Sequence, residues 1–527
     1  MNRYQMLLGA DAREPQAASG WNIARLLPAS GLYGANGMSV GPDGRLYVTQ
    51  AFGSQVTAVD VRDGAMEIIS PLGGPIVAPD DVGFDSHGIM YVTEVMSARV
   101  CARTPDGKTR IVADNLPSAN GLTVHQDRVF IDEFRGGGRI FELYPHDGRE
   151  PRLIADGLRG PNALMVGPDG KLYFPLVPNG EVWRVDIDTG VKEKVVDGLK
   201  SPPAVKFNPR GELIVPQAGN GEIVRIDIQS GAKTVIAKVR PGIDNFAFAP
   251  DGRMFVSHFV DGGVAEVATD GSNVERVLVP KGLVGPWGLA CGSDGNLYLN
   301  DGLSLGVLSP TRQVGRLGGL LDSSFPGFVR SLTAGAPGEL WLTTMAGDVA
   351  QYFPDGRPFH LLARKLKNPY GIVRLPDGTV AVAEAGTGKL LRIDAAGTAS
   401  TLAEGLAKPC EVVAKNGAIF VSELGAGRVV KIENGATTTV LDGLKKPMGL
   451  AVRGDALLVL DRGTKDLRAV NLGTGSAQTL ASHLPVGDPD GCSRGPMDFS
   501  GGLAVAGDGT IYIAADGEGS VLTLQAA

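Results

Sequence analysis

Five asparagine and aspartate residues recur in the first half of the chain, at intervals of about 40 residues or twice that. They are Asn36, Asp80, Asn120, Asn162 and Asp244, and each opens a short apolar segment such as NALMV. Amide and carboxylate oxygens are hard ligands that suit Ca²⁺, Mg²⁺ or Mn²⁺. If these side chains meet away from water, they need a cation, ordered water or one another as partners. The pattern predicts a divalent-cation site, with strand capping and water binding as the alternative.

Three further side chains could transfer protons. Glu94, Glu133 and His258 share one position of the repeat described below, near the end of its second strand. Of the six histidines in the chain, His258 alone falls at this position. Imidazole titrates near neutral pH, so His258 is a candidate general base, with a hydrogen-bonded structural histidine as the alternative. Glu94 and Glu133 are candidates for activating water.

The equivalent opening positions in the second half of the chain carry different chemistry. Four of them are Trp287, Arg330, Tyr370 and Glu411. An arginine, two aromatic rings and a carboxylate together predict a binding site for a polar substrate. The same side chains could instead form a salt-bridged plug that neutralises itself.

A repeat must position these candidates. The stretch GPDGRLYVTQ (41–50) returns as GPDGKLYFPL (167–176) and as APDGRMFVSH (249–258). Each unit of about 40 residues holds four short strand-like segments separated by turns, which is typical of a propeller blade. The alternation of apolar and polar residues excludes helical repeats of similar length. Twelve such units predict an all-β protein with two tandem six-bladed β-propellers, made of twelve four-stranded blades.

Blade geometry separates structural positions from functional ones. The first strand of a blade lines the central channel, and an antiparallel hairpin places its turn at the opposite rim from the two strand ends. Asp43 lies in such a turn, so we expect it to supply turn geometry. The opening residues and His258 should share the other rim, where chemistry is expected.

The chain ends predict how the rings close. Residues 21–29 resemble a fourth strand without its blade, and the last residues resemble a third strand without a fourth. In a serial arrangement, residues 1–270 form the first propeller, closed by 21–29, and residues 271–527 form the second, opened by 273–279. The competing arrangement keeps 273–279 in the first propeller and closes the second with the N-terminus. We expect the serial arrangement.

Composition excludes several classes of partner. The 527 residues carry a net charge of −7 without a long block of like charge, so we expect no nucleic-acid partner. No apolar run is long enough to span a bilayer, and the N-terminus lacks the apolar core of a signal peptide. Four widely separated cysteines indicate a reducing, cytoplasmic location. The oligomeric state stays open.

The blade motifs ANGMSVGPDGRLYVTQ, PDDVGFDSHGIMYVTE and GPNALMVGPDGKLYF resemble the family of senescence marker protein, gluconolactonase and luciferin-regenerating enzyme. The resemblance implies six-bladed propellers with one divalent cation at the channel mouth, Ca²⁺ in the first place and Mg²⁺, Mn²⁺ or Zn²⁺ as alternatives. It implies Asn120, Asn162 and Asp244 as ligands, with Asp80 or Asn36. The family has a glutamate where this chain has Asn36. The blades are also similar in style to streptogramin lyases, which open a cyclic ester by elimination.

Three functions remain in view. The first is a metal-dependent hydrolase of a lactone or related cyclic ester, in which the cation polarises the carbonyl and His258, Glu94 or Glu133 activates water. The second is a lyase in which the same cation acidifies a C–H bond for removal by His258. The third is a non-catalytic propeller that binds a partner on one face.

Overall fold

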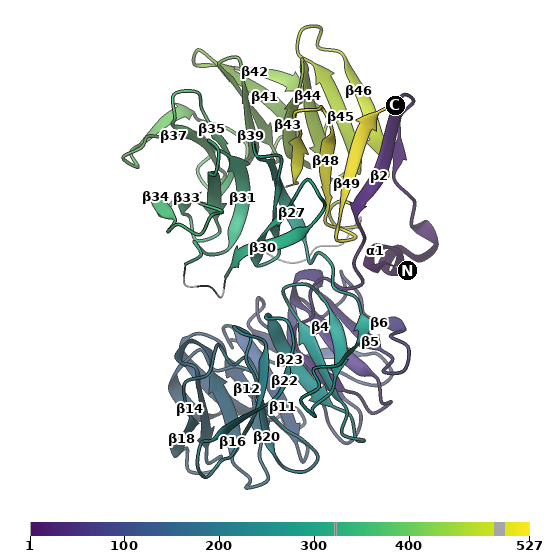
Figure 1. Ribbon diagram of the computed structural model, residues 1–527, viewed down its shortest axis with the longest axis vertical. Coiled ribbons are helices and arrows are strands. Elements are labelled where there is room, and N and C mark those ends of the chain that lie inside the picture. Colours follow the sequence, from purple (N-terminus) through teal and green to yellow (C-terminus); the bar gives the residue numbers. More distant parts are fainter. Residues whose placement is uncertain (1, 321, 323, 490–500) are drawn as a thin grey trace. The chain divides into compact units, whose positions relative to one another are not determined.

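The chain is almost entirely β-structure in a computed structural model that describes residues 2–320, 322, 324–489 and 501–527 (Figure 1). Among these residues, twelve antiparallel sheets follow one another, each with four strands and one with β1 (Gln16–Ala17) as a fifth. This confirms the predicted all-β class. The chain forms two compact units of six sheets each. Unit 1 comprises residues 30–284, and unit 2 comprises residues 2–29, 285–489 and 501–527.

The inner strands of unit 1 form a ring. These strands are β3 (Met38–Val40), β7 (Pro79–Phe84), β11 (Ala119–His125), β15 (Met165–Val166), β19 (Lys206–Phe207) and β23 (Ile243–Phe248). Contacts join β3 to β7, β7 to β11, β11 to β15 and β23 back to β3. The Val205 N–H donates to Ala163 O at 3.0 Å, which links the fourth sheet to the fifth. Ser257 Oγ donates to Asn36 O at 2.7 Å, from the sixth sheet to the first.

The inner strands of unit 2 form a second ring. They are β27 (Pro286–Cys291), β31 (Val329–Ala334), β35 (Pro369–Arg374), β39 (Pro409–Lys415), β43 (Pro447–Arg453) and β47 (Leu503–Val505). Each contacts the next, and β27 contacts β47 to complete the circle. Six sheets around a ring of inner strands, in each unit, are consistent with the predicted six-bladed propellers.

The turn aspartates are structural, as predicted. Asp43 Oδ1 accepts a hydrogen bond from the Arg45 N–H at 3.1 Å, and Asp43 Oδ2 accepts one from the Tyr47 hydroxyl at 3.1 Å. Gly44 between them has φ of 79°, a conformation that glycine adopts without a steric penalty. The repeat at Asp169 makes the same two contacts with Lys171 and Tyr173. Each aspartate therefore holds its hairpin turn together.

The predicted serial closure is wrong, and the competing arrangement is correct. Strand β26 (Glu275–Val279) pairs with β25 (Val264–Val267), so unit 1 builds its sixth sheet from consecutive strands. Strand β2 (Trp21–Leu27) pairs with β49 (Ser520–Ala526) and completes the last sheet of unit 2, where the purple and yellow strands adjoin (Figure 1). The predicted boundary between residues 270 and 271 therefore moves to 284/285. A short turn joins β25 to β26, and such a hairpin has a low cost of loop closure.

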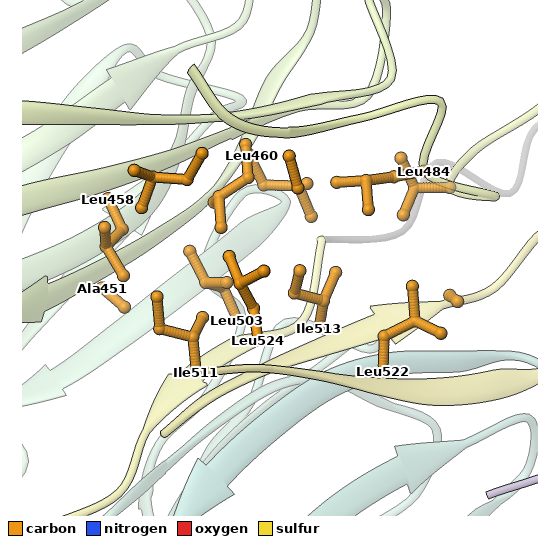
Figure 2. Close-up of a cluster of buried hydrophobic side chains, with 14 of the residues drawn as sticks. Ala451, Leu458, Leu460, Leu484, Leu503, Ile511, Ile513, Leu522 and Leu524 are labelled. Carbon is orange, nitrogen blue, oxygen red and sulfur yellow. The ribbon is translucent and has the colours of Figure 1, made fainter. Parts of the chain in front are cut away.

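The cores lie between neighbouring sheets. Figure 2 shows one in unit 2, where Leu458 and Leu460 of β44 (Ala456–Asp461) face Ile511, Ile513 and Leu522 of the last sheet. The side chains of Trp21 and Ile23 in β2 pack against this cluster. Among the described residues, no helix is long and apolar enough to cross a membrane.

Candidate functional site

The structure brings two of the predicted ligands together at the channel mouth of unit 1. Asp80 on β7 and Asp244 on β23 belong to the two sheets that flank the first sheet of the ring. Burial, followed by the charge of Asp244, raises the pKa of Asp80 well above its usual range. Burial, followed by the charge of Asp81, raises the pKa of Asp244 to about 7, against the opposing charge of Lys206. These carboxyl groups are thus close enough to repel each other when ionised.

The three predicted asparagine ligands differ in their partners. Asn120 on β11 is 7% exposed, and its Oδ1 has no hydrogen-bond partner within the described part of the chain. Asn162 Oδ1 accepts a hydrogen bond from the next residue's N–H at 2.7 Å, and Asn36 Oδ1 accepts one from Ala51 at 3.3 Å. A buried amide oxygen without a donor is costly, and a cation is one partner that satisfies it.

The donor set fits a hard divalent cation. Across the described ranges, no group of three or more His, Cys, Asp or Glu side chains is arranged to hold a metal. The candidates are therefore the two carboxylates of Asp80 and Asp244 and the amide oxygen of Asn120. Oxygen donors of mixed charge are the ligands that Ca²⁺ and Mg²⁺ use.

Sequence analysis missed three side chains in the same channel. Asp81 is 3% exposed and accepts hydrogen bonds from the N–H groups of Val82 and Leu122 at 2.9 and 3.1 Å. Its Oδ1 also accepts from Asn245 Nδ2 of the sixth sheet at 3.2 Å. The Lys206 ammonium group donates to Met38 O at 2.8 Å. The available signal was a charged or amide residue within an apolar inner strand, as in PDDVGF and PAVKF.

Asp132 occupies a position that a hydroxyl group fills in other sheets. In those sheets, the penultimate residue of the second strand is a hydroxyl-bearing residue such as threonine. Its hydroxyl donates to the backbone carbonyl of the residue that opens the next sheet. Examples are Thr93 Oγ1 to Asn120 O at 2.5 Å and Thr343 Oγ1 to Tyr370 O at 2.6 Å. Asp132 is fully buried, and its Oδ1 accepts from the Gly121 N–H at 3.1 Å. Its Oδ2 has no partner in the described residues.

Burial raises the pKa of Asp132 to about 8, against the opposing Gly121 hydrogen bond. The acid is therefore neutral at pH 7, and its hydroxyl can donate as the threonines do.

This raised pKa predicts a loss of stability at alkaline pH. Because the folded-state pKa lies above the ordinary value of 3.8, the stabilising effect is complete below pH 3.8 and is lost as the pH rises through about 8. We expect Asp132→Asn, which is neutral at every pH, to reduce the loss of unit 1 stability between pH 6 and pH 9. Thermal unfolding at these pH values measures it, and equal losses in wild type and variant would contradict it.

His258 lies in the interior of unit 1. It ends β24 (Met254–His258), is fully buried, and neither ring nitrogen has a hydrogen-bond partner among the described residues. Burial, and then the charge of Arg240, lower its pKa to about 3, although Asp261 opposes them. Its charged neighbours belong to the Arg240–Asp261 ion pair, with N–O distance 2.6 Å. The predicted role as general base stays a prediction. Full burial weighs against it, and the lack of ring hydrogen bonds within the described residues weighs against the hydrogen-bonded structural alternative.

Glu94 and Glu133 are held in ion pairs. Glu94 ends β8 (Met90–Glu94), accepts from Arg99 Nε at 2.6 Å, and is fully buried. Glu133 ends β12 (Arg128–Glu133), is fully buried, and accepts from Arg135 and Arg139 at 2.8 and 2.5 Å. None of these contacts supports the predicted activation of water. The arginines follow within six residues, so the pairing had a signal in the sequence.

The repeat position that Glu94 and Glu133 occupy has a structural role in six other sheets. There its side chain accepts a hydrogen bond from a backbone N–H of the loop that leads into the sheet. The pairs, at 2.6–2.9 Å, are Gln50 with Tyr33, Gln217 with Lys200, Asp301 with Gly285, Glu384 with Lys367, Glu423 with Ala407 and Asp461 with Lys445. This position therefore fastens a loop to its sheet.

Two of the four predicted substrate residues of unit 2, Trp287 and Glu411, line a cavity. Arg330 donates to Asn368 Oδ1, and its guanidinium carbon lies 4.3 Å from the centroid of the Tyr370 ring. Trp287 stacks on Phe328 with a centroid distance of 6.3 Å. Trp287 and Glu411 line a cavity of about 300 Å³ that residues from all six inner strands enclose. Their role in binding substrate stays a prediction.

Two comparisons match parts of this chain to known proteins. The model of the virginiamycin B lyase family matches residues 191–465. A gluconolactonase of Zymomonas mobilis is 32% identical over 143 residues, which are 27% of this chain and 33% of the relative. The chain thus spans about a third of the length of that relative. Both matches agree with the resemblance that the blade motifs show.

Solved structures show more distant likenesses. The calcium-binding protein regucalcin of Agrobacterium tumefaciens has 18% identity and a TM-score of 0.37, over 44% of this chain and 84% of its own. The extracellular domain of a putative one-component system from B. thetaiotaomicron has 10% identity and a TM-score of 0.33, over 95% of this chain and 82% of its own.

Proposed function

The chain belongs to the virginiamycin B lyase family, and from this premise we propose that it opens a lactone or related cyclic ester, with a divalent cation at the channel mouth of unit 1. One observation carries the proposal. The carboxyl groups of Asp80 and Asp244, which are partly exposed on their inner strands, have raised pKa values, and the Oδ1 atom of Asn120 has no hydrogen-bond partner among the described residues. Such a set is stabilised by a bound cation.

The cation, when bound, polarises the ester carbonyl and stabilises the negative charge that develops on its oxygen. Asp80 and Asp244 would hold it with their charges, and Asn120 would add a neutral oxygen. Thr93 positions Asn120, because its hydroxyl donates to the Asn120 carbonyl and its Oγ1 accepts from the Asp81 N–H at 2.9 Å. Thr49 likewise donates to the carbonyl of Asp80. The two threonines thus fix the backbone at the candidate ligands Asn120 and Asp80.

Hydrolysis is the reaction that we propose first. The gluconolactonase relative supports it. The full burial of His258 weighs equally against its predicted roles in hydrolysis and in elimination, because it is a candidate base for both. The lyase reaction is the second candidate, because the matched family model carries that name.

The product and its oxygen atoms distinguish the reactions. The full chain, freed of metal with a chelator, is assayed for opening of gluconolactone in ¹⁸O-labelled water, with a protein-free blank. We expect activity after addition of Ca²⁺, Mg²⁺, Mn²⁺ or Zn²⁺, with one ¹⁸O atom in the acid. A streptogramin ester is tested in parallel, and a new C=C bond without ¹⁸O would assign the lyase reaction. Undiminished activity in the chelated protein would contradict the cation-dependent mechanism.

A further inference from the structure

Lys206 crosses the channel of unit 1. Its side chain starts on β19 of the fifth sheet, and its Nζ donates to the carbonyl of Met38 on β3 of the first sheet at 2.8 Å. On the way, Nζ lies 5.7 Å from the centroid of the Phe246 ring on β23, in the sheet between them. A lysine side chain that bridges two non-adjacent sheets is fixed in place, with its ammonium group inside the channel.

Hydrogen bonds of the neighbouring residues place this ammonium group beside the candidate cation site. Gly37, next to Met38, donates its N–H to the Asp80 carbonyl at 2.8 Å, and Asn245, next to Phe246, donates to Asp81 Oδ1 at 3.2 Å. Burial raises the pKa of both Asp81 and Asp244, and the positive charge of Lys206 opposes this rise. Burial lowers the pKa of Lys206 to about 8, and the negative charges of Asp81 and Asp244 oppose this shift. Asp81 is itself tied to Asn245 of the sixth sheet, so it stays near Lys206. The channel therefore contains an internal cation beside the carboxylates that we propose for a metal.

We propose that Lys206 is a resident cation of this site: its ammonium group compensates Asp81 and Asp244 in the metal-free protein and weakens the binding of a divalent cation beside them. Two cations near the same carboxylates repel each other, and the low dielectric constant of a buried channel strengthens that repulsion. Lys206 thus limits the cation affinity of the site and keeps its carboxylates partly neutralised when the site is empty. This inference rests on the carboxyl cluster of the proposed function and adds a residue that controls it.

The test removes the charge and measures cation binding directly. Full-length wild type and Lys206→Met are freed of metal and titrated with Ca²⁺ and with Mg²⁺ in a calorimeter at pH 7.5. Lys206→Arg keeps the charge, so its affinity should remain near that of wild type. Lys171→Met is the matched control, because it removes an exposed lysine of the same unit that pairs with Glu193 at 3.6 Å. Circular dichroism checks folding, and Lys206→Gln replaces Lys206→Met if the latter fails to fold.

We expect Lys206→Met to bind the cation at least ten-fold more tightly than wild type, with no change in Lys171→Met. Equal or weaker affinity in Lys206→Met would overturn the role of Lys206 and leave the proposed function standing. Binding by Lys206→Met alone would support the role of Lys206 and overturn the cation requirement of the proposed function. Absence of binding in both proteins would overturn both.

Discussion

Deletion of residues 2–29 is expected to destabilise unit 2 strongly and to leave the stability of unit 1 unchanged. Strand β2 pairs with β49 from Trp21↔Ala526 to Leu27↔Val521, and Trp21 and Ile23 pack on the core in Figure 2. Without β2, the last sheet loses its outer strand and exposes this core. A loss of several kcal/mol corresponds to a decrease of about 10 °C or more in the melting temperature of a unit of this size.

Buried polar contacts of the same segment add to this effect. Arg3 is 1% exposed and donates to the carbonyls of Gly517 and Asp516 at 3.2 and 2.6 Å. Arg25 Nε pairs with Glu518 Oε1 at 2.8 Å, and Glu518 is itself 1% exposed. Removing the arginines leaves buried acceptors without their donors, which is more costly than removing exposed pairs.

Differential scanning calorimetry, which measures the unfolding transitions, and limited proteolysis, which locates the cleaved residues, test this prediction. Wild type should show unfolding of both units, and the deletion should lower only the transition of unit 2, with cleavage confined to residues beyond 284. A shorter deletion of residues 2–12 is the control, because it removes α1 (Arg3–Leu8) and keeps β2, so its effect should be smaller. Loss of unit 1 instead would contradict the pairing of β2 with β49 and restore the serial closure.

The double substitution Asp80→Asn and Asp244→Asn is expected to lower cation affinity by 100-fold or more and to abolish ester opening. Asparagine keeps the size and one oxygen of each side chain and removes the negative charge that holds a divalent cation. Calorimetric titration with Ca²⁺ and Mg²⁺ measures the affinity, and the gluconolactone assay measures the activity. Asp188→Asn, at an exposed turn of the same unit, is the matched control. Full cation binding by the double variant would contradict the assignment of the site.

The same variant has a stability signature that separates charge from folding. The pKa of Asp244 is raised to about 7 in the folded state and that of Asp80 is raised well above its usual range, so the stability present below their ordinary pKa of 3.8 is lost as the pH rises through the raised values. In metal-free buffer, the double variant should therefore lose less unit 1 stability than wild type between pH 6 and pH 9. A variant that unfolds at every pH would instead show that the carboxyl groups are needed for folding.

Much of the fold could be predicted because its signals are local. The Asp43 turn depends on contacts that reach only to Arg45 and Tyr47, so the sequence shows it and its repeats directly. The alternation within each strand is equally local, and the count of twelve units follows from it. The electrostatic effect of Asp244 on Asp80 agrees with the same count, because both residues occupy the opening position of their sheets.

The sequence by itself therefore determined the all-β class, the twelve sheets and the ring positions of the ligand candidates. Only the tertiary structure decided which strand closes each ring, because β2 and β26 have similar patterns and the choice depends on the connections of the whole chain. It also decided that His258 is buried and that Lys206 reaches Met38 across the channel. These facts depend on which side chains of distant strands share a buried volume, and burial and charge pairing are properties of that volume rather than of any short stretch of sequence.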